Sequence, residues 1–356
     1  MTNQKMRSKA PTVADVARAA SVSKAQAARA LGGYGAVSEE VQTRVNRAAA
    51  ALGYRPNEVA RTMNTGRSNT IGVIVGDIEN PHFGLALRGM ADVARQAGFH
   101  LLLGNSDEKL QAEQDAVRVM LEKRVDGIIV APSHSEWDKN GHLLQILEEG
   151  RALRLFDRAV SDLDVEAICC DFTRVAREAT QRLLAAGHQH IAYITSMELE
   201  GTCRDATDFG LTPVAQRVGG MMAAFRAAGA VYDTSLIQAN AGSDAQIAHI
   251  VDTLWQRATP PTALIASDSL VAMSLLRAVA QRGLRIPQDL SFIMYDNFPW
   301  SEIVTPPLTV VAQPVYEMGC EAARRLIADI RGESAGPLPA FSAELVERHS
   351  IAAPAQ

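Results

Sequence analysis

The sequence is poor in aromatic residues and cysteines, and it contains no long apolar run. Of its 356 residues, 5% are aromatic and four are cysteines. The cysteines form no C-x-x-C pair, a pattern typical of reduced structural thiols and not of a disulfide framework. No run of about 18 apolar residues occurs, and the polar N-terminus lacks the apolar core of a signal peptide. We therefore expect a soluble, cytoplasmic protein with no membrane partner.

Signatures of common α/β enzymes are missing as well. The chain has no G-x4-G-K-[ST], no G-x-G-x-x-G after an apolar run and no G-x-S-x-G. His188 and His190 in "GHQHIA" suggest a metal only if Cys169 and Cys170 join them, and the spacing is not that of a zinc site. We expect no catalytic residues, no metal and no cofactor. A cytosolic sugar-active α/β enzyme is the less favoured alternative.

Charge is distributed unevenly along the chain, and this asymmetry is informative about partners. The formal net charge is −5, yet residues 1–69 contain eleven Lys or Arg and only four Asp or Glu. The remaining residues contain 24 basic and 36 acidic side chains. A basic head on an acidic body is expected when one end of a protein binds the phosphates of nucleic acid. The length and the apolar content of 47% fit two or three globular domains.

Helix start signals predict three short helices in the basic head. Thr12 begins a capping box, Ser23 is placed to cap a second helix, and Ser38 is placed to cap a third. In the second helix, Ala28 is expected to face the core. Three short helices with a tight turn between the first two predict a helix-turn-helix domain, which we place at residues 10–56.

From residue 71 onward, apolar runs alternate with amphipathic helical segments. The runs are "IGVIVG", "HLLLG", "DGIIVA" and "ALRLF", followed by "AICC", "IAYIT", "LIQA", "TALIA" and "SFIMY". Such alternation predicts parallel sheets that are covered by helices. A break near residues 157–171 divides the runs into two sets. We therefore expect an α/β body with two lobes of doubly wound parallel sheet.

The second helix of the head is suited to reading DNA. If it starts after Ser23, then Lys24, Ala25 and Arg29 point outward, and a long cation there can donate to guanine O6 and N7 in the major groove. The small alanine allows close approach to the groove. A solvated surface helix is the alternative interpretation, and the basic surroundings favour the DNA-binding one.

The segments "TVADVARAASVS" and "VSEEVQTRVNRAAAALGYRPNEVARTM" resemble the lactose-repressor/galactose-repressor (LacI/GalR) family of bacterial transcription regulators, and the resemblance extends over essentially the whole chain. Ser21 stands where the family has a turn glycine. "PNEVARTM" is similar to the hinge helix that enters the minor groove, with Met63 in place of an intercalating leucine. The resemblance implies that DNA is contacted by Thr12, Ser23, Lys24, Ala25, Gln26, Arg29, Tyr54, Asn57, Ala60, Arg61 and Met63.

Polar side chains follow several apolar runs of the body. "GDIENPHF", "FDR", "ASD" and "YDN" occupy residues 76–83, 156–158, 266–268 and 295–297. Doubly wound sheets bind ligands beyond the carboxyl ends of their strands. Carboxylates that accept from vicinal hydroxyls, an arginine that donates in return, and an aromatic face suit a monosaccharide or a similar polyol.

The family's regulatory body is similar to periplasmic sugar-binding proteins, with the effector held between two lobes. By this resemblance Phe83 stacks on the ligand, His82 replaces an aromatic ring, and Ser267 replaces an asparagine. The implied effector-binding residues are Asp77, His82, Phe83, Asp157, Arg158, Arg217, Ser267, Asp296 and Gln313.

Other roles stay open for some of these residues. Asp77 is as well placed to cap the entry of a helix, Asp157 and Arg158 are able to form an interlobe ion pair, and Asp296 is able to cap a loop. A nucleobase or nucleoside co-repressor is the alternative to a sugar.

Together with the family, the sequence predicts a homodimeric, operator-binding repressor of a carbohydrate-utilisation operon, with DNA affinity controlled by a small sugar. The hinge helix and linker are placed at residues 57–69, the first lobe at 70–170 plus 303–332, and the second lobe at 171–302 plus 333–356.

Overall fold

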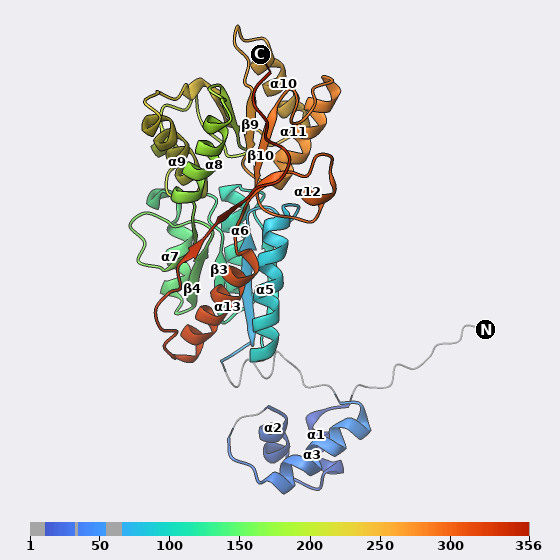
Figure 1. Ribbon diagram of the computed structural model, residues 1–356. Coiled ribbons are helices and arrows are strands. Elements are labelled where there is room, and N and C mark those ends of the chain that lie inside the picture. The colour runs from blue at the N-terminus through green and yellow to red at the C-terminus, as the bar shows by residue number, and fades with distance from the viewer. Residues whose placement is uncertain (1–10, 33–34, 55–65, 356) are drawn as a thin grey trace, which may run out of the picture. The chain divides into compact units, whose positions relative to one another are not determined.

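The computed structural model describes residues 11–32, 35–54 and 66–355. These residues belong to two compact units (Figure 1). One unit extends to Thr70 and includes Arg124–Asp126, and the other is formed by Ile71–Lys123 and the residues from Gly127 onward. We call the first unit the head and the second the body.

Three helices build the head, as the capping residues predict. They are α1 (Val13–Ala19), α2 (Lys24–Gly32) and α3 (Glu39–Leu52). The Thr12 side chain accepts from the N–H of Asp15 in a capping box, and the Ser38 side chain accepts from the N–H of Val41. The head therefore has the helix-turn-helix arrangement expected from its sequence.

The core of the head is small and differs in one detail from the prediction. Val16 of α1, Ala27 of α2 and Val45 of α3 are fully buried. The buried alanines of α2 are Ala27 and Ala30, whereas Ala28 is half-buried. Successive residues of an α-helix lie about 100° apart around its axis. The face of α2 that packs against the core of the head is therefore rotated by about one residue from the predicted face.

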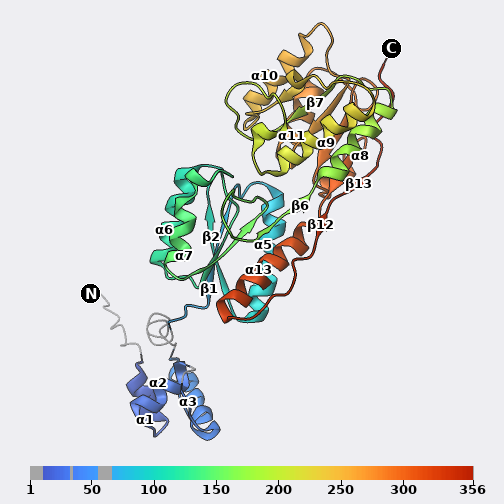
Figure 2. The same cartoon turned by 90° about the vertical axis from the view of Figure 1, so that its left-hand side faces the viewer.

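The first sheet of the body has the order β2-β1-β3-β4-β5, and β1, β3, β4 and β5 pair in parallel. Its strands are β1 (Thr70–Val75), β2 (His100–Asn105), β3 (Gly127–Val130), β4 (Ala152–Phe156) and β5 (Ala167–Ile168). Its helices are α5 (Pro81–Ala97), α6 (Leu110–Glu122), α7 (Gly141–Glu148) and α13 (Val315–Arg331). Figure 2 shows α6 and α7 on one face of the sheet and α5 and α13 on the other. We call this assembly the first lobe.

The second sheet has the order β13-β11-β10-β9-β7-β8, and only β13 runs antiparallel to its neighbour among the described pairs. Its strands are β7 (Ile191–Ile194), β8 (Ile237–Gln238), β9 (Ala263–Ala266), β10 (Ser291–Tyr295), β11 (Thr309–Ala312) and β13 (Glu344–Val346). The helices of this second lobe are α8 (Thr173–Ala185), α9 (Pro213–Ala227), α10 (Asp244–Trp255), α11 (Ser269–Gln281) and α12 (Trp300–Ile303). In Figure 1, α8 and α9 lie on one side of β9 and β10, and α10 and α11 lie on the other. The doubly wound architecture is confirmed.

One predicted boundary between the lobes is wrong, and one apolar run belongs to the other set of strands. Residues 303–332 were assigned to the first lobe, but β11 pairs in parallel with β10 of the second sheet, so the chain returns to the first lobe only after Ala312. The run "AICC" was expected to open the second set, yet β5 is the last strand of the first sheet. Its continuation, β6 (Cys170–Asp171), pairs with β12 (Phe341–Ser342). Short apolar runs fit either sheet, and pairing decides between them.

The helix α13 packs closely against α5 in the first lobe. Glycines make this approach possible: a Cβ on Gly319 would lie 2.2 Å from the carbonyl oxygen of Ala86, and one on Gly89 would lie 2.3 Å from that of Tyr316. Any larger side chain would push the helices apart.

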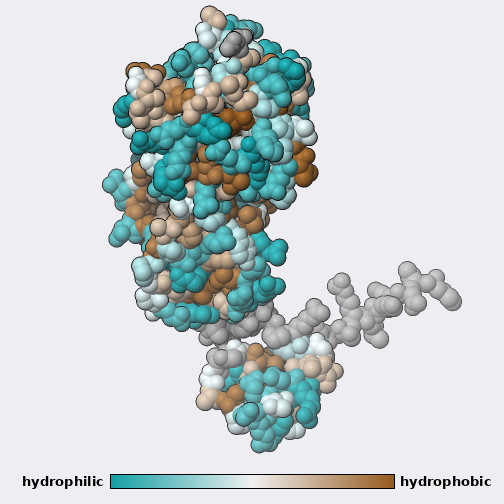
Figure 3. Space-filling model, in the orientation of Figure 1, coloured by the Kyte–Doolittle hydropathy of each residue, from teal (hydrophilic) through white to brown (hydrophobic). Residues whose placement is uncertain are grey.

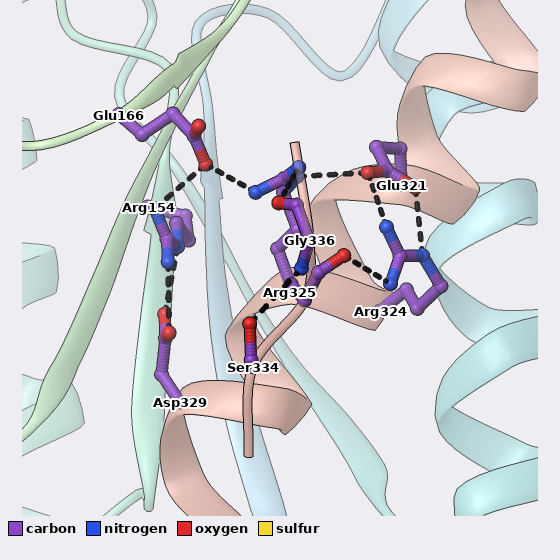
Figure 4. Close-up of polar contacts among 9 residues, drawn as sticks. Arg154, Glu166, Glu321, Arg324, Arg325, Asp329, Ser334 and Gly336 are labelled. Atoms are coloured by element: carbon purple, nitrogen blue, oxygen red, sulfur yellow. Dashed lines mark hydrogen bonds and ion pairs between the residues drawn. The ribbon is translucent and has the colours of Figure 1, made fainter. Parts of the chain in front are cut away.

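A polar network also fastens α13 to the first sheet, as Figure 4 shows. Glu166 accepts from Arg154 of β4 at 2.9 Å and from Arg325 of α13 at 2.8 Å. Arg154 also donates to Asp329 at 2.7 Å, and Arg325 donates to the carbonyl of Gly336 at 2.8 Å. Because Arg325 is only 3% exposed, its charge needs such partners. The network fixes the start of the segment that leads back to the second lobe.

The surface is that of a globular protein. On the face of the body in Figure 3, apolar residues lie in small groups among polar ones. Single exposed apolar side chains such as Val231 and Ile303 are ordinary for such a surface. Within the described residues, no helix is both long and apolar enough to cross a membrane.

Candidate functional site

The outer face of α2 carries the cations predicted to meet DNA. Lys24 and Ala25 are exposed, and the Arg29 Nε donates to the carbonyl of Ala25 at 3.3 Å. The start of the helix is capped reciprocally: the Ser23 Oγ accepts from the Gln26 N–H at 3.1 Å, and the Gln26 Oε1 accepts from the Ser23 N–H at 3.0 Å. The residues predicted to read bases thus share the first turns of one helix, which is the geometry of a recognition helix.

The turn between α1 and α2 keeps a left-handed backbone although it lacks the expected glycine. Ser21 has a φ of 53°, a conformation that costs an L-residue about 1–2 kcal/mol. Arg44 of α3 donates to the carbonyls of Ala20 and Ser21, both at 2.8 Å, and so supports the turn. The substitution therefore preserves the geometry of the turn and adds backbone strain.

The remaining residues predicted to contact DNA fall into two groups. The Thr12 Oγ1 donates to the Asp15 carboxylate at 2.7 Å, and hydrogen bonds from Thr12 lower the pKa of Asp15. Tyr54 is partly buried against the core of the head. Outside the described residues lie Asn57, Ala60, Arg61 and Met63.

In the body, two aspartates follow one strand in each lobe. Asp157 comes directly after β4, and Asp296 comes directly after β10. Both have left-handed backbones, with φ of 66° and 76°. Such strain in residues other than glycine is concentrated at functional sites. Both carboxylates face His82 at the start of α5: Asp157 Oδ1 lies 3.5 Å from its Nε2, and Asp296 Oδ1 lies 4.0 Å from its Nδ1.

The environment of His82 favours its charged form. Burial lowers the pKa of this histidine, but the carboxylates of Asp157 and Asp296 outweigh burial, so the pKa lies above its ordinary value. Burial would raise the pKa of Asp157, yet His82, Arg158 and Arg217 lower it to about 2. A buried imidazolium is thus shared by carboxylates of both lobes.

Arg217 of α9 is held between two aromatic rings. Its guanidinium carbon lies 4.2 Å from the ring centroid of Phe172 and 4.1 Å from that of Tyr295. One terminal nitrogen donates to the carbonyl of Ser267 at 2.7 Å. Cation–π contacts that are shielded from water contribute about 2 kcal/mol. The rings fix the plane of the guanidinium.

Gln313 joins the second sheet to this cluster. Its Nε2 donates to Asp296 Oδ1 at 2.7 Å and lies 3.2 Å from His82 Nδ1. Within the described residues, four buried atoms of the cluster have no hydrogen-bond partner: His82 Nε2, Arg217 Nε, Gln313 Oε1 and the Tyr193 hydroxyl oxygen. A buried polar atom left unpaired costs about 1–3 kcal/mol, so their gathering here indicates a place for a polar ligand.

Three predicted effector residues have other partners. The Asp77 carboxylate accepts from the Glu79 N–H at 2.8 Å, as in the alternative role at a helix entry. Phe83 is buried in the main core of the body. The Ser267 hydroxyl donates to the neighbouring Asp268 at 2.6 Å, so this residue offers the cluster its backbone carbonyl.

Arg158 is paired within the first lobe. It donates to Glu108 at 2.8 Å and to the carbonyl of Pro132 at 3.1 Å, and its Nε lies 3.5 Å from Asp157. The contacts of Arg158 are therefore all within the first lobe. Asp157 is linked to Asp296 of the second lobe through His82, which lies near both carboxylates.

Sequence reasoning missed the rings around Arg217. Phe172, Tyr193 and Tyr295 lie in or beside apolar runs, where they look like ordinary core residues. The available signal was their position: Tyr295 directly precedes Asp296, and Phe172 directly precedes α8, in a chain with few aromatic residues.

The described residues offer no metal centre, because no group of three or more His, Cys, Asp or Glu side chains among them is placed to hold an ion. His188 lies 2.9 Å from the Thr262 hydroxyl and 2.8 Å from the Ser291 hydroxyl. It is a buried residue in a hydrogen-bond network of the second lobe.

Known proteins are similar in sequence to both the head and the body of this chain. Residues 12–57 match the bacterial regulatory proteins of the lacI family, and residues 180–351 match the periplasmic binding protein-like domain. The ribose operon repressor of Bacillus subtilis (strain 168) is 31% identical, over 90% of this chain and 92% of that protein. Catabolite control protein A of Priestia megaterium is 31% identical, over 88% of this chain and 91% of that protein. The chain belongs to the LacI family.

A solved LacI family transcriptional regulator from Enterococcus faecium, with bound ribose, has a TM-score of 0.65 to this chain. The two chains are 28% identical, and the aligned region covers 80% of this chain and 99% of the Enterococcus faecium chain. Membership of the LacI family accounts for a helix-turn-helix head followed by a two-lobed body of parallel sheets. The names of these relatives describe a control protein, an operon repressor and a transcriptional regulator.

Proposed function

We propose that this protein is a sequence-specific DNA-binding regulator that represses a carbohydrate-utilisation operon. Its operator affinity is controlled by a small sugar bound between the two lobes. Membership of the LacI family supports the DNA-binding role. The ribose bound to the Enterococcus faecium regulator and the operon named for the Bacillus subtilis relative support a sugar.

The observation that carries the proposal is the cluster around Arg217. Carboxylates, an amide, an imidazole, a guanidinium and the hydroxyl of Tyr193 meet at one place, and four of their buried atoms lack hydrogen-bond partners within the described residues. Hydroxyls both donate and accept, so a polyol satisfies these groups together, and the rings of Phe172 and Tyr295 offer C–H contacts. The effector residues named from the sequence are proposed in this role, with Asp157, His82, Arg217, Asp296 and Gln313 at its centre.

We propose that the protein acts as a homodimer, with two heads on one operator. One head carries one recognition helix, and a duplex site read by two heads is pseudo-palindromic. Lys24, Ala25 and Arg29 read base edges, and the hinge residues Ala60 and Met63 enter the minor groove. Sugar binding changes the arrangement of the lobes and, by linkage, the affinity for DNA.

A ligand screen tests the sugar. Purified full-length protein is titrated with D-ribose, other pentoses, hexoses and nucleosides, with thermal unfolding and calorimetry as readouts. We expect one sugar to raise the melting temperature and to be recovered unchanged. Stabilisation by nucleosides alone, or turnover of the sugar, would contradict the proposal.

The wedge role of Met63 has a separate test. Met63→Ala is expected to reduce operator affinity and DNA bending while sugar binding stays the same, because the apolar wedge is lost from the hinge. Gel mobility of circularly permuted duplexes measures bending. Unchanged bending rules the wedge out.

A further inference from the structure

Two loops from opposite lobes meet at a second place, outside the cluster around Arg217. One is residues 132–137, which follow β3, and the other is residues 205–212, which precede α9. The Leu211 N–H donates to the Ser135 Oγ at 3.2 Å, and Ser135 is 6% exposed. A Cβ on Gly210 would lie 2.2 Å from the same Oγ, and Gly210 has a φ of 62°. Only glycine fits this position while the loops touch.

Buried side chains of the first lobe hold the loop of residues 132–137 in place by hydrogen bonds. Glu113 of α6 is fully buried and accepts from the Ser133 N–H at 2.6 Å. Its other oxygen lies 2.7 Å from the Nε2 of His142 on α7. Asn140 donates to the carbonyls of residues 134 and 136, at 3.0 and 2.8 Å. Buried polar groups used in this way specify one conformation of a loop.

The same loop is tied to the segment that follows Asp157. The Arg158 guanidinium donates to the carbonyl of Pro132 at 3.1 Å, and the Ser161 N–H donates to the carbonyl of Ser135 at 2.8 Å. Movement of residues 157–161 is therefore transmitted to Ser135.

The loop of the second lobe is tied to Arg217. It contains a short helix, η2 (Ala206–Phe209), which begins with a capping box at Asp205. The Thr212 Oγ1 donates to the carbonyl of Phe209 at 2.8 Å and accepts from the N–H of the first turn of α9 at 3.3 Å. Because Arg217 lies on the next turn of α9, Leu211 and Arg217 move together.

We propose that Ser135 and Gly210 are positioning residues that form a closure contact, which holds the lobes in the arrangement that places Arg217 and Asp296 of the second lobe against His82 and Asp157 of the first. The contact acts through the two loops and does not touch the ligand. Its link to sugar binding rests on the function proposed above, whereas the contact itself does not.

Four variants of the full-length chain test the contact: Ser135→Ala, Ser135→Gly, Gly210→Ala and the double variant that combines Ser135→Gly with Gly210→Ala. Gly201→Ala is the matched control, because Gly201 also has a positive φ, of 82°, but no atom lies within 4 Å of its added Cβ. The probe is D-ribose, with calorimetric affinity as one readout and denaturant unfolding without ligand as the other.

The expected results follow from one hydrogen bond and one clash. Ser135→Ala weakens D-ribose binding about 2- to 10-fold, which corresponds to one hydrogen bond. Gly210→Ala weakens binding more than tenfold, and the double variant recovers part of this loss because the Oγ is gone. Gly201→Ala binds D-ribose as the wild type does.

Two results would overturn the proposal. One is a Gly210→Ala variant that binds like Gly201→Ala. The other is strict additivity of Ser135→Gly and Gly210→Ala in unfolding, because residues in contact couple. If the wild type binds no D-ribose, D-ribose is not the effector, and the double-mutant cycle of unfolding free energies alone decides whether the contact exists.

Discussion

The head and the proposed effector site use charged residues in opposite environments. On α2, Lys24 and Ala25 are exposed to solvent, and the cation acts only when DNA arrives. In the body, His82, Arg217 and Asp296 are all less than a tenth exposed, and each needs partners inside the fold. Exposed charges cost little to keep and to remove, whereas buried ones are coupled to stability. The two sites should therefore respond differently to the same kind of substitution.

The largest effect is expected from Arg217→Ala. The change takes a nearby positive charge away from the buried Asp157 and Asp296, and it removes the group that lies between the rings of Phe172 and Tyr295. Unfolding free energy should fall by about 3–5 kcal/mol, and sugar binding should be lost. Denaturant unfolding and calorimetry measure both. Arg226→Ala, an exposed arginine of the same helix, is the control. Equal unfolding free energies of Arg217→Ala and Arg226→Ala would contradict the coupling of buried charges to stability.

Removal of cations from α2 should affect DNA alone. Lys24→Ala and Arg29→Ala should each weaken operator binding by about 1–3 kcal/mol, because each loses contacts to base edges. The unfolding free energy should change by less than about 0.5 kcal/mol. Fluorescence anisotropy with a labelled duplex measures the first effect. Arg285→Ala, an exposed arginine of the body, serves as the charge-matched control. Operator affinity equal to that of the control would exclude this face of α2 as the reader.

The buried imidazolium makes the body sensitive to pH. The pKa of His82 is raised by Asp157 and Asp296 against burial, so its stabilising contribution is complete below the ordinary histidine pKa and is lost as pH rises through the raised value. The pKa of Asp157, lowered to about 2, gives stability that is present above its ordinary value and lost as pH falls toward 2.

The stability difference between the wild type and His82→Phe should therefore be largest between about pH 4 and 6.5 and should shrink toward alkaline pH. His188, whose pKa burial lowers, contributes with the opposite sign, but it is present in both proteins and cancels. Urea unfolding at several pH values measures the difference. A difference that grows with rising pH would contradict the charged form of His82.

The smallest expected effect is a gain in the head. Ser21→Gly should stabilise the head by roughly 1 kcal/mol, because glycine adopts the left-handed turn without strain. Part of the gain is offset by the greater freedom of glycine in the unfolded chain. Hydrogen exchange of amides in α1 to α3 detects it. Faster exchange in the variant would show that Ser21 is not strained.

Much of the fold could be predicted because its signals are local. Capping residues such as Thr12 and Ser38 mark helix starts within three or four residues, and βα alternation marks the sheets. The assignment of β11 and β5 to their sheets could not be predicted, because "TVVA" and "AI" carry no periodicity that distinguishes one sheet from the other.

The effector site could be predicted only in part. Strand-end position and the family resemblance pointed to Asp157 and Asp296, and the structure brings both to His82. The pairing of Arg158 with Glu108 and the rings around Arg217 depend on contacts between residues distant in sequence. No local pattern encodes such contacts.

The most direct test of the account is operator binding with and without sugar. Anisotropy of the full-length protein is measured on a duplex from its own promoter region at several salt concentrations, with and without a saturating sugar identified by the ligand screen. We predict affinity that falls steeply with salt, preference over an unrelated duplex, and a change of about 5- to 150-fold on adding the sugar. Equal binding to both duplexes, or an affinity that the sugar leaves unchanged, would contradict it.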